Sequence, residues 1–521
     1  MTFAADPERR FDRHLGLASE LAGKSRSEVI RKFVDQRLLL TGDPERLATP
    51  AGRLMLLVTA NLIARFCPKI DLQLDPSERM LVDETLGLLH RIDSSRHAEF
   101  RMVARPALST YAGALAIGAP TTGMPVDVVI DAAGWLAAIS TIGALPPLPR
   151  TADGNPFGAL IAAALGAAEI FKHLVKPRPG KAFPFGTATF SAYDYSVDSL
   201  DPGPTLHPAT VLPPTLLAGV GAVGNAFLLA LSNVPNVCGD LYPVDKEQVD
   251  DPSNLNRYSL AEERDADPEH PMPKTHLAVR LFEGTGLDVH PLQVPLDTAL
   301  KRVHNGELPR PTIVASAVDN NAARDDLQKL WPDVLLEGAT DHTLAQVSRH
   351  EHGSGLACLL CIHSRPSNAN EFSYVSHAAE ISGLSQAVIA ASLRDAEMVV
   401  TDAHIEGAPD AMRTHLAAHV GKPICSVVGE LERLSAKPAA ELPHQPTVSF
   451  VSMMSGVLMA AELVKYVGGL GSGLLTFFQI DTMFPLQNAG LQTVEAVSNC
   501  YCITRSDAIR QYRAVVQSSV K

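Results

Sequence analysis

The chain has 521 residues, of which 46% are hydrophobic and 19% are charged, and its formal net charge is −13. This balance is typical of a folded globular protein, and the length predicts about three domains at roughly 150 residues each. The acidic charge and the 5% aromatic content argue against a nucleic-acid partner or an anionic membrane surface. The N-terminus has no apolar run typical of a signal peptide, so we expect a cytoplasmic protein.

The first third of the chain alternates helix-like and strand-like segments. The expected elements are a helical region over residues 1–40, a buried helix over 55–66, a strand entering a turn over 126–134 and a long Ala-rich helix over 155–175. No glycine-rich phosphate loop occurs in this part of the sequence. Residues 176–214 are rich in Pro and Gly, which is a composition typical of a linker.

A clearer strand–helix alternation follows. The expected elements are a strand and helix over 216–231, strands over 237–244, 288–294 and 312–317, and helices over 275–284 and 322–329. Such alternation predicts a parallel, doubly wound α/β sheet. Residues 367–445 break the pattern with helix-like, polar sequence and are interpreted as an inserted domain, after which the alternation resumes.

A GxGxxG pattern formed by Gly219, Gly221 and Gly224 lies between an expected strand and an expected helix. Such glycines permit a tight turn and let backbone N–H groups approach a phosphate at the helix N-terminus. Asp245 follows about 20 residues later, at the end of the next strand, where a carboxylate can bind ribose hydroxyls. On this evidence a dehydrogenase and a turn needed only for packing both stay open.

Further residues follow the glycines in a fixed order: the segment SNLNR with Asn254 and Arg257, then Lys274, then the segment ASAVDN with Asp319. This order resembles the ThiF/MoeB and ubiquitin-activating enzyme family over about residues 210–365 and 445–505, and it argues against a dehydrogenase. Three departures are Glu247 in place of a second Asp, Tyr258 in place of Gln, and one extra residue before Asn254.

The resemblance implies that the chain adenylates the C-terminal carboxylate of a protein with ATP and Mg²⁺. Gly219, Gly221, Gly224 and Asp245 would bind the nucleotide. Arg257 and Lys274 match the family's phosphate-contacting residues, Asn254 matches its nucleotide-positioning residue, and Asp319 matches its magnesium ligand. Cations beside the phosphates would stabilise the charge that develops on pyrophosphate. The alternative for each charged residue is an exposed surface charge.

The N-terminus carries a second part of the resemblance. The segment RFDRH, residues 10–14, resembles the family's Arg-aromatic-x-Arg-Gln/His opening, whose second Arg reaches the ATP of the partner domain. Arg13 matches that residue, with a helix-surface arginine as the alternative. Residues 41–190 lack the glycine loop and therefore fit an inactive adenylation half that faces the active half within one chain.

These features predict an α/β protein with two Rossmann-like ThiF-type halves, one inactive and one active, in a pseudo-dimer with an inserted helical domain. The expected domains are 1–190, inactive; 191–366, the first part of the active half; 367–445, the catalytic-cysteine insertion; and 446–521, the closing part of the active half.

The seven cysteines divide by pattern. Two pairs, Cys358 with Cys361 and Cys500 with Cys502, could supply four thiolates to a structural zinc ion, and paired cysteines at such positions are common in ThiF/MoeB-like proteins. The alternative is four buried apolar cysteines. Cys67 and Cys238 lie in apolar segments and are expected in the core.

Cys425, within the segment GKPICS, resembles the thioester-forming cysteine of ubiquitin-activating enzymes. As a thiolate it would attack the acyl-adenylate and form a thioester. The alternative is a buried structural cysteine.

The favoured function is activation of a ubiquitin-like protein, followed by transfer from Cys425 to a conjugating enzyme. The layout resembles the single-chain activating enzymes of bacterial ubiquitin-like conjugation operons linked to antiphage defence. The first alternative is a sulfur-carrier adenylyltransferase of the ThiF/MoeB type that forms no thioester. A catalytically inactive scaffold is the second alternative. Nucleic-acid and membrane partners are not expected, and homodimer formation stays open.

Overall fold

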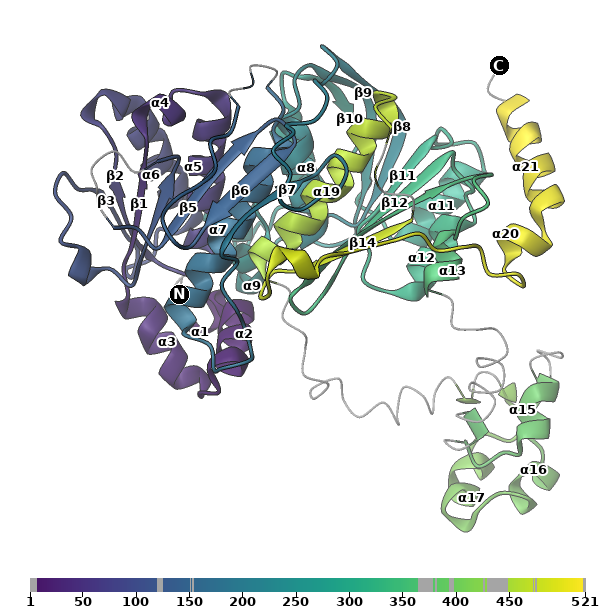
Figure 1. The fold of residues 1–521 in the computed structure, drawn as a ribbon. Coiled ribbons are helices and arrows are strands. Elements are labelled where there is room, and N and C mark those ends of the chain that lie inside the picture. The colour runs from purple at the N-terminus through teal and green to yellow at the C-terminus, as the bar shows by residue number, and fades with distance from the viewer. Residues whose placement is uncertain are drawn as a thin grey trace. The chain divides into compact units, whose positions relative to one another are not determined.

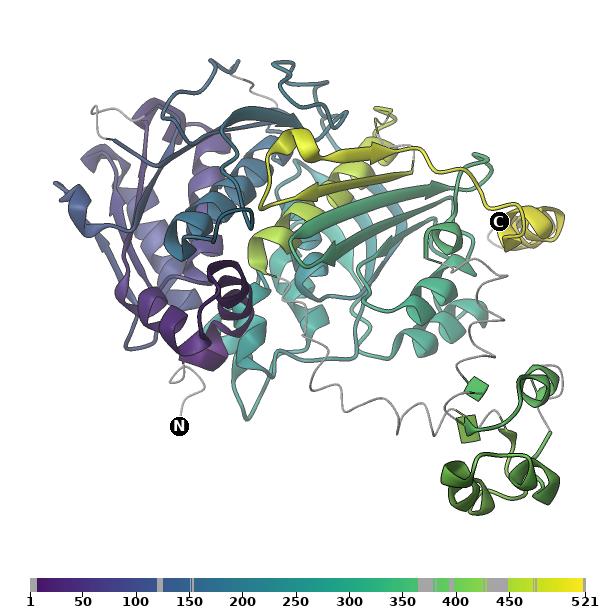
Figure 2. The same cartoon turned by 60° about the horizontal axis from the view of Figure 1, so that its bottom comes forward.

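The computed structural model describes residues 7–119, 125–149, 151, 154–363, 378–379, 382–392, 398–424, 427–428, 448–471, 473 and 476–518. The chain forms two compact units. The larger unit comprises Met1–Cys361 and Pro446–Lys521, and the smaller comprises Ile362–Gln445. Within the described residues, the larger unit contains one sheet of seven strands and one of eight (Figures 1 and 2).

The first sheet is mixed. Its strands lie side by side in the order β3 (Glu99–Met102), β2 (Lys69–Gln73), β1 (Leu38–Gly42), β4 (Gly113–Ile117), β5 (Val128–Ala133), β6 (Leu136–Ser140) and β7 (Thr187–Ser191). The strands from β3 to β5 pair in parallel, whereas β6 and β7 pair antiparallel.

The second sheet repeats this order. Its strands are β10 (Gly286–Val289), β9 (Val237–Val244), β8 (Thr210–Ala218), β11 (Ile313–Ser316), β12 (Val334–Asp341), β13 (Leu344–Glu351), β14 (Phe477–Asp481) and β15 (Gly490–Gln492). The strands from β10 to β12 pair in parallel, and the remaining pairs are antiparallel. The predicted parallel sheet is thus confirmed from β10 to β12, but the sheet as a whole is mixed, because only two residues join β12 to β13 and so short a connection makes an antiparallel hairpin.

Helices cover the faces of both sheets. In the first half, α5 (Pro50–Ala64) and α7 (Phe157–Val175) pack on the first sheet. In the second half, α8 (Ala222–Ser232) and α19 (Ser449–Val467) pack on the second sheet, and α7 contacts α19 where the halves meet (Figure 1). By length and composition α7 and α19 could cross a membrane, but 94% and 89% of their most apolar windows are buried inside the protein. They are therefore interpreted as core helices.

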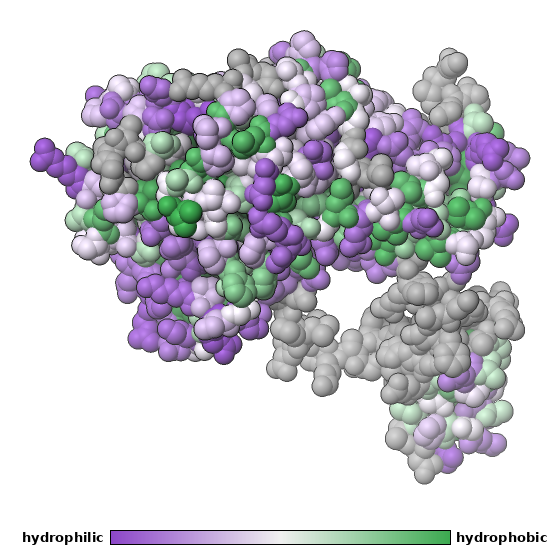
Figure 3. Space-filling view, viewed as in Figure 1, coloured by the Kyte–Doolittle hydropathy of each residue, from purple (hydrophilic) through white to green (hydrophobic). Residues whose placement is uncertain are grey.

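The larger unit contains further α-helices at its ends and between its strands. They are α1 (Pro7–Arg10), α2 (Asp12–Ala22), α3 (Arg26–Asp35), α4 (Pro44–Leu47), α6 (Arg79–Ile92), α9 (Pro252–Arg257), α10 (Lys274–Phe282), α11 (Leu296–His304), α12 (Asn321–Gln328), α13 (Leu359–His363), α20 (Tyr501–Thr504) and α21 (Ser506–Ser518). On the face drawn in Figure 3, hydrophilic side chains gather over α2 and α3. This agrees with α3, which buries Val29 and Phe33 and presents a polar outer face.

Two sequence-based expectations need correction. Residues 38–40 are not helical, because they begin the central strand β1, whose five residues are all buried. A strand buried on both faces reads as a continuous apolar run, which periodicity does not distinguish from a helix. Residues 176–214 are more than a linker, since Thr187–Ser191 forms β7 and pairs with β6.

The smaller unit, taken by itself, is helical in its described part. Its described helices of five or more residues are α15 (Gln386–Ser392), α16 (Asp402–Glu406) and α17 (Asp410–Ala417). A separate apolar cluster, which includes Leu384, Ile389, Leu416 and Ile424, forms its core. Cys425 lies outside the described residues.

Candidate functional site

A cavity of about 450 Å³ lies at the carboxyl ends of β8, β9 and β11. This edge of an open α/β sheet, where the strand order reverses, is the usual place for a ligand. The polar and glycine residues that line the cavity are Gly219, Gly221, Asp245, Lys246, Glu247, Arg257, Tyr258, Lys274, Asp319, Asn320, Arg324, Gly338 and Thr340. The cavity therefore brings together cations, carboxylates and the start of a helix.

The glycine turn forms one wall of this cavity. Gly219 has a φ of +88°, and a Cβ there would lie 2.6 Å from the carbonyl oxygen of Ala317. A Cβ at Gly224 would lie 2.2 Å from the carbonyl oxygen of Gly219. In contrast, a Cβ at Gly221, which caps α8, would have no heavy atom within 4 Å. Gly219 and Gly224 thus shape the turn, while the backbone at Gly221 stays open to a phosphate at the helix N-terminus.

Asp245 follows β9 and joins two loops of the cavity wall. Its Oδ2 accepts a hydrogen bond of 2.9 Å from the backbone N–H of Val220. Its Oδ1 accepts one of 2.9 Å from the backbone N–H of Glu247. The carboxylate therefore holds the glycine turn against the loop after β9, at the position where this fold binds a ribose.

Lys274 is the first residue of α10 and lies in the cavity wall with its side chain 5% exposed. Its ammonium forms an ion pair with Glu247 and lies 5.0 Å from the ring centre of Tyr258. Burial disfavours the charged form, but Tyr258 and Glu247 outweigh this effect, so the pKa of Lys274 is raised. A hydrogen bond from Lys274 in turn lowers the pKa of Glu247. The lysine therefore faces the cavity as a fixed positive charge at neutral pH.

Arg257 ends α9, and α2, which carries Arg13, packs against α9. Burial and the neighbouring charge of Arg257 lower the pKa of Arg13 to about 10. Among the described residues, the buried Nε atoms of both arginines make no hydrogen bond. Two guanidinium groups in this setting favour a negatively charged ligand close by.

Asp319 lies beyond the end of β11 and is exposed. Its Oδ1 accepts a hydrogen bond of 3.3 Å from Asn320, whose own Oδ1 accepts one from Ala323 at the start of α12. Magnesium binds through one or two carboxylates together with substrate phosphates. An exposed carboxylate at a cavity that also holds a phosphate-type turn fits that requirement.

Not every predicted residue lines the cavity. Gly224 packs inside α8, Asn254 is 4% exposed within α9, and Arg13 reaches only the neighbourhood of Arg257. The cavity also contains Tyr258 and Arg324, to which the sequence-based interpretation gave no role. Arg324 forms an ion pair with the buried Glu337 and follows Asp319 by five residues, shortly after the ASAVDN segment of the motif order.

The four paired cysteines converge at one place. Their ligand atoms all lie within 4.8 Å of one another. Sγ–Sγ distances are 3.7 Å for Cys358–Cys361, 3.6 Å for Cys358–Cys500 and 3.6 Å for Cys361–Cys502. Thiolates at about 2.3 Å from a tetrahedral zinc would lie about 3.8 Å apart, so the cluster fits structural zinc.

The two remaining described cysteines differ from this cluster. Cys67 is buried, and burial raises the pKa of its thiol to about 12, as expected for a core residue. Cys238 is only half-buried, so its predicted place in the core is wrong. Its strand β9 lies next to the short outer strand β10, which leaves this position partly open.

Comparisons with known proteins agree with this geometry. A model of the ThiF family matches residues 214–502, and a model of the BilD N-terminal domain matches residues 37–181. The protein y4jF of Sinorhizobium fredii (strain NBRC 101917 / NGR234) is 28% identical over 407 residues, which is 75% of each chain.

Crystal structures of Escherichia coli MccB are similar at a lower level. The structure with MccA-N7isoASN is 13% identical with a TM-score of 0.36, and the structure with ATP is 14% identical with a TM-score of 0.35. Each alignment covers 56% of this chain and 66% of MccB, so the chain spans slightly less than two thirds of that protein.

The ThiF match covers more than half of the chain, including both sides of the cavity and the four-cysteine cluster. The chain therefore belongs to the ThiF family of adenylyltransferases, with a BilD N-terminal domain before the family's own domain.

Proposed function

We propose that this chain activates a ubiquitin-like protein with ATP. The observation that carries the proposal is the single cavity in which Gly221, Arg257, Lys274 and Asp319 meet, within a chain of the ThiF family. The match to a BilD N-terminal domain supports a bacterial ubiquitin-like antiphage system as the setting. We further propose that the protein acts in the cytoplasm.

In the first step, the C-terminal carboxylate of the ubiquitin-like protein attacks the α-phosphorus of ATP. A carboxylate-oxygen–phosphorus bond forms, the bond to the β-phosphate oxygen breaks, and pyrophosphate leaves with the bonding electrons. Lys274 and Arg257 would stabilise the growing negative charge from fixed positions. Asp319 would hold Mg²⁺, which supplies further charge neutralisation when it is bound.

In the second step, the thiolate of Cys425 attacks the acyl carbon of the adenylate. The thioester forms, the acyl–oxygen bond breaks, and AMP leaves. A conjugating enzyme would then accept the acyl group. The support for this step is the sequence around Cys425 and its place in an inserted unit between β13 and α19.

The test combines two measurements on the full chain with ATP, Mg²⁺ and ubiquitin-like proteins from the same organism. We expect ATP–pyrophosphate exchange together with a thiol-sensitive adduct on a non-reducing gel. Cys425→Ala should abolish the adduct and keep the exchange, while Cys238→Ala serves as the matched control that keeps both. Exchange without any adduct in the wild type would instead support a sulfur-carrier type adenylyltransferase, and absence of exchange would contradict the proposal.

A further inference from the structure

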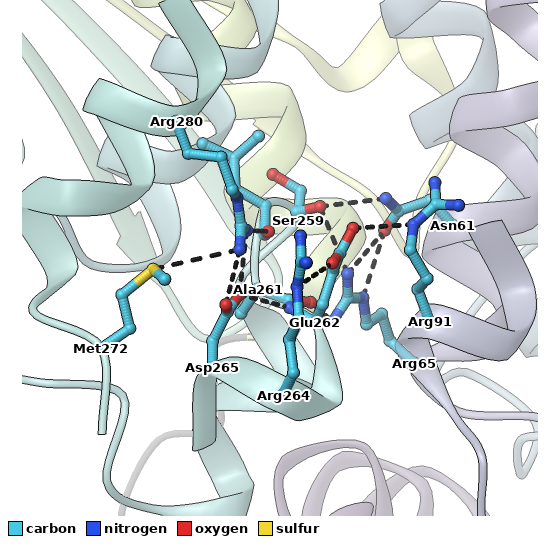
Figure 4. Close-up of polar contacts among 11 residues, drawn as sticks. Asn61, Arg65, Arg91, Ser259, Ala261, Glu262, Arg264, Asp265, Met272 and Arg280 are labelled. Carbon is cyan, nitrogen blue, oxygen red and sulfur yellow. Dashed lines mark hydrogen bonds and ion pairs between the residues drawn. The ribbon is translucent and has the colours of Figure 1, made fainter. Parts of the chain in front are cut away.

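One segment of the second half connects the N-terminal half to the cavity. This segment, residues 255–261, contains the cavity residues Arg257 and Tyr258. The helix α5 of the N-terminal half ends directly beside it, and Figure 4 shows Asn61 of that helix and Arg65, the residue that follows it, directed towards the backbone of the segment.

Arg65 donates to three carbonyl groups of the segment. Its Nη1 donates to the carbonyl oxygens of Leu255 at 2.7 Å and Ala261 at 2.9 Å. Its Nη2 donates to the carbonyl oxygen of Ser259 at 3.2 Å. Asn61 donates to the same Ser259 oxygen at 2.9 Å and accepts from Arg65 Nε at 3.1 Å, which fixes the guanidinium.

Both side chains are buried, Arg65 being 2% exposed and Asn61 6% exposed. A return hydrogen bond of 3.1 Å runs from Asn256 Nδ2 to the carbonyl oxygen of Arg65. Burial and the charge of Arg10 lower the pKa of Arg65 to about 9, so the guanidinium stays charged at neutral pH. Buried carbonyl groups need donors, and one planar group here serves three of them.

The bonded carbonyls lie on both sides of the cavity residues. Tyr258 is 2% exposed, and its ring centre lies 5.2 Å from Arg257 Cζ and 5.0 Å from Lys274 Nζ. Arg65 therefore fixes the backbone that presents Arg257 and Tyr258, and Tyr258 in turn contacts Lys274. This forms a continuous path of contacts from α5 to the cavity wall.

A second set of contacts, farther along the chain, is more exposed. Arg91 Nε lies 2.9 Å from Glu262 Oε1, and the backbone N–H of Ser94 donates to Glu263 Oε2 at 2.7 Å. The Arg91 side chain is 50% exposed, and such surface pairs contribute little. The Asn61–Arg65 pair therefore supplies buried side-chain hydrogen bonds to this segment, whereas the contacts of Arg91 and Ser94 lie at the surface.

We propose that Arg65, oriented by Asn61, is a positioning residue through which the BilD-type N-terminal half sets the affinity of the second half for ATP. The proposal rests on the proposed function, because it assumes that the cavity binds ATP. It extends that function by giving the N-terminal half a direct part in it, even though neither residue lines the cavity.

The test uses the full chain with one substitution near the start of α5 and one directly after its end. Arg65→Met keeps a long apolar side chain but removes every donor, and Arg53→Met is the matched control, since Arg53 is 41% exposed and pairs with Glu84 instead. The affinity for the ATP analogue AMPCPP with Mg²⁺ is measured by calorimetry. Amide hydrogen exchange of peptides covering residues 254–262 is measured without nucleotide.

We expect Arg65→Met to bind AMPCPP about 10-fold more weakly and to exchange faster over 254–262. The thermal midpoint of each variant shows that it is folded, and Asn61→Ala provides a milder variant with the same direction of change. Arg65→Lys, which places one charge but not the planar set of donors, should restore only part of the affinity. Arg53→Met should match the wild type in both measurements.

One result would contradict the positioning role of Arg65, and another would contradict the ATP site itself. Wild-type affinity and wild-type amide exchange in Arg65→Met would overturn the positioning role and leave the proposed function intact. Failure of the wild-type protein to bind AMPCPP would contradict the ATP site itself, and the positioning role would then fall with it.

Discussion

The two halves of the larger unit share one strand order but differ in the residues that follow their central strands. Both place the first strand of the half next to the second and fourth, and both end in antiparallel strands. Their long helices α7 and α19 each have 19 residues and each bury a Glu-x-x-Lys ion pair, Glu169 with Lys172 and Glu462 with Lys465. These shared features support a diverged duplication.

The halves differ where the central strand ends. After β8, the glycine turn leaves the backbone open to the cavity. After β1, the short helix α4 takes the corresponding position: Leu47 packs against Gly42, and Arg46 forms an ion pair with Asp131. In the first half, protein side chains therefore pack where the chain leaves the central strand, whereas in the second half the backbone at that point borders the cavity. A few residues after one strand, rather than the fold, decide which half can bind a nucleotide.

The largest effect should come from the cavity of the second half. We expect Lys274→Ala to reduce ATP–pyrophosphate exchange by about 100- to 1000-fold, because a fixed charge beside the reacting phosphates is lost. Lys329→Ala, which removes an exposed lysine paired with Asp326, is the control and should keep the wild-type rate. A near-normal rate in Lys274→Ala would place the chemistry elsewhere.

Among the described residues, the four-cysteine cluster lies only in the second half. The zinc content of the protein should therefore depend on these four cysteines. Cys361→Ser should reduce bound zinc from about one ion per chain to almost none, because a structural site uses four ligands. Elemental analysis of purified protein measures this directly. Cys238→Ser, a half-buried cysteine outside the cluster, should keep the zinc, and equal zinc in both variants would refute the site.

The side chains of Arg46 and Leu47, which pack after β1 in the first half, should contribute to stability and not to nucleotide binding. Arg46→Ala leaves Asp131 in a largely buried setting without its ion pair. We expect the free energy of unfolding to fall by about 2 kcal/mol, less than for a fully buried pair because both groups keep some contact with water. Urea denaturation measures this change. A loss of AMPCPP affinity in the folded variant would contradict the separation of roles between the halves.

The smallest expected effect is a change in folding stability with pH, caused by His14 at the contact between the halves. His14 is fully buried beside Ser449 and the rings of Phe66 and Phe171, and burial lowers its pKa to about 3. Between about pH 6.5 and 3 the unfolded chain binds a proton at this site that the folded chain does not, so stability falls as pH decreases.

From pH 7.5 to 5.5 this contribution amounts to about 1.4 kcal/mol. His14→Gln should remove it, so the variant should lose less stability than the wild type over that interval when both are unfolded in urea. An identical pH dependence in the two proteins would show that His14 is not held neutral.

The sequence predicts much of the second half, because its elements have strong local signals. The strand at 237–244 and the glycine turn agree with β9 and with the cavity wall. The predicted zinc cysteines also converge, although 139 residues separate Cys361 from Cys500 in the numbering. Motif order carries such information even when the three-dimensional distances are unknown.

Other features depend on tertiary contacts that periodicity does not report. β7 is a short strand in Pro- and Gly-rich surroundings and forms only because β6 offers an edge to pair with. Asn61 and Arg65 lie four residues apart at the end of the largely apolar helix α5, which is a signal for a buried polar contact, but their partners are about 190 to 200 residues away. Asn254, assigned to the nucleotide from its motif, is buried within α9, and its role stays a prediction.

The most direct test of the account is the number and place of nucleotide sites per chain. Calorimetric titration of the full chain with AMPCPP and Mg²⁺ should give one site per chain, and Lys274→Glu should abolish it by replacing the cavity's buried cation with an anion. Two sites in the wild type, or one site unaffected by Lys274→Glu, would contradict the claim that the cavity after β8 alone binds ATP.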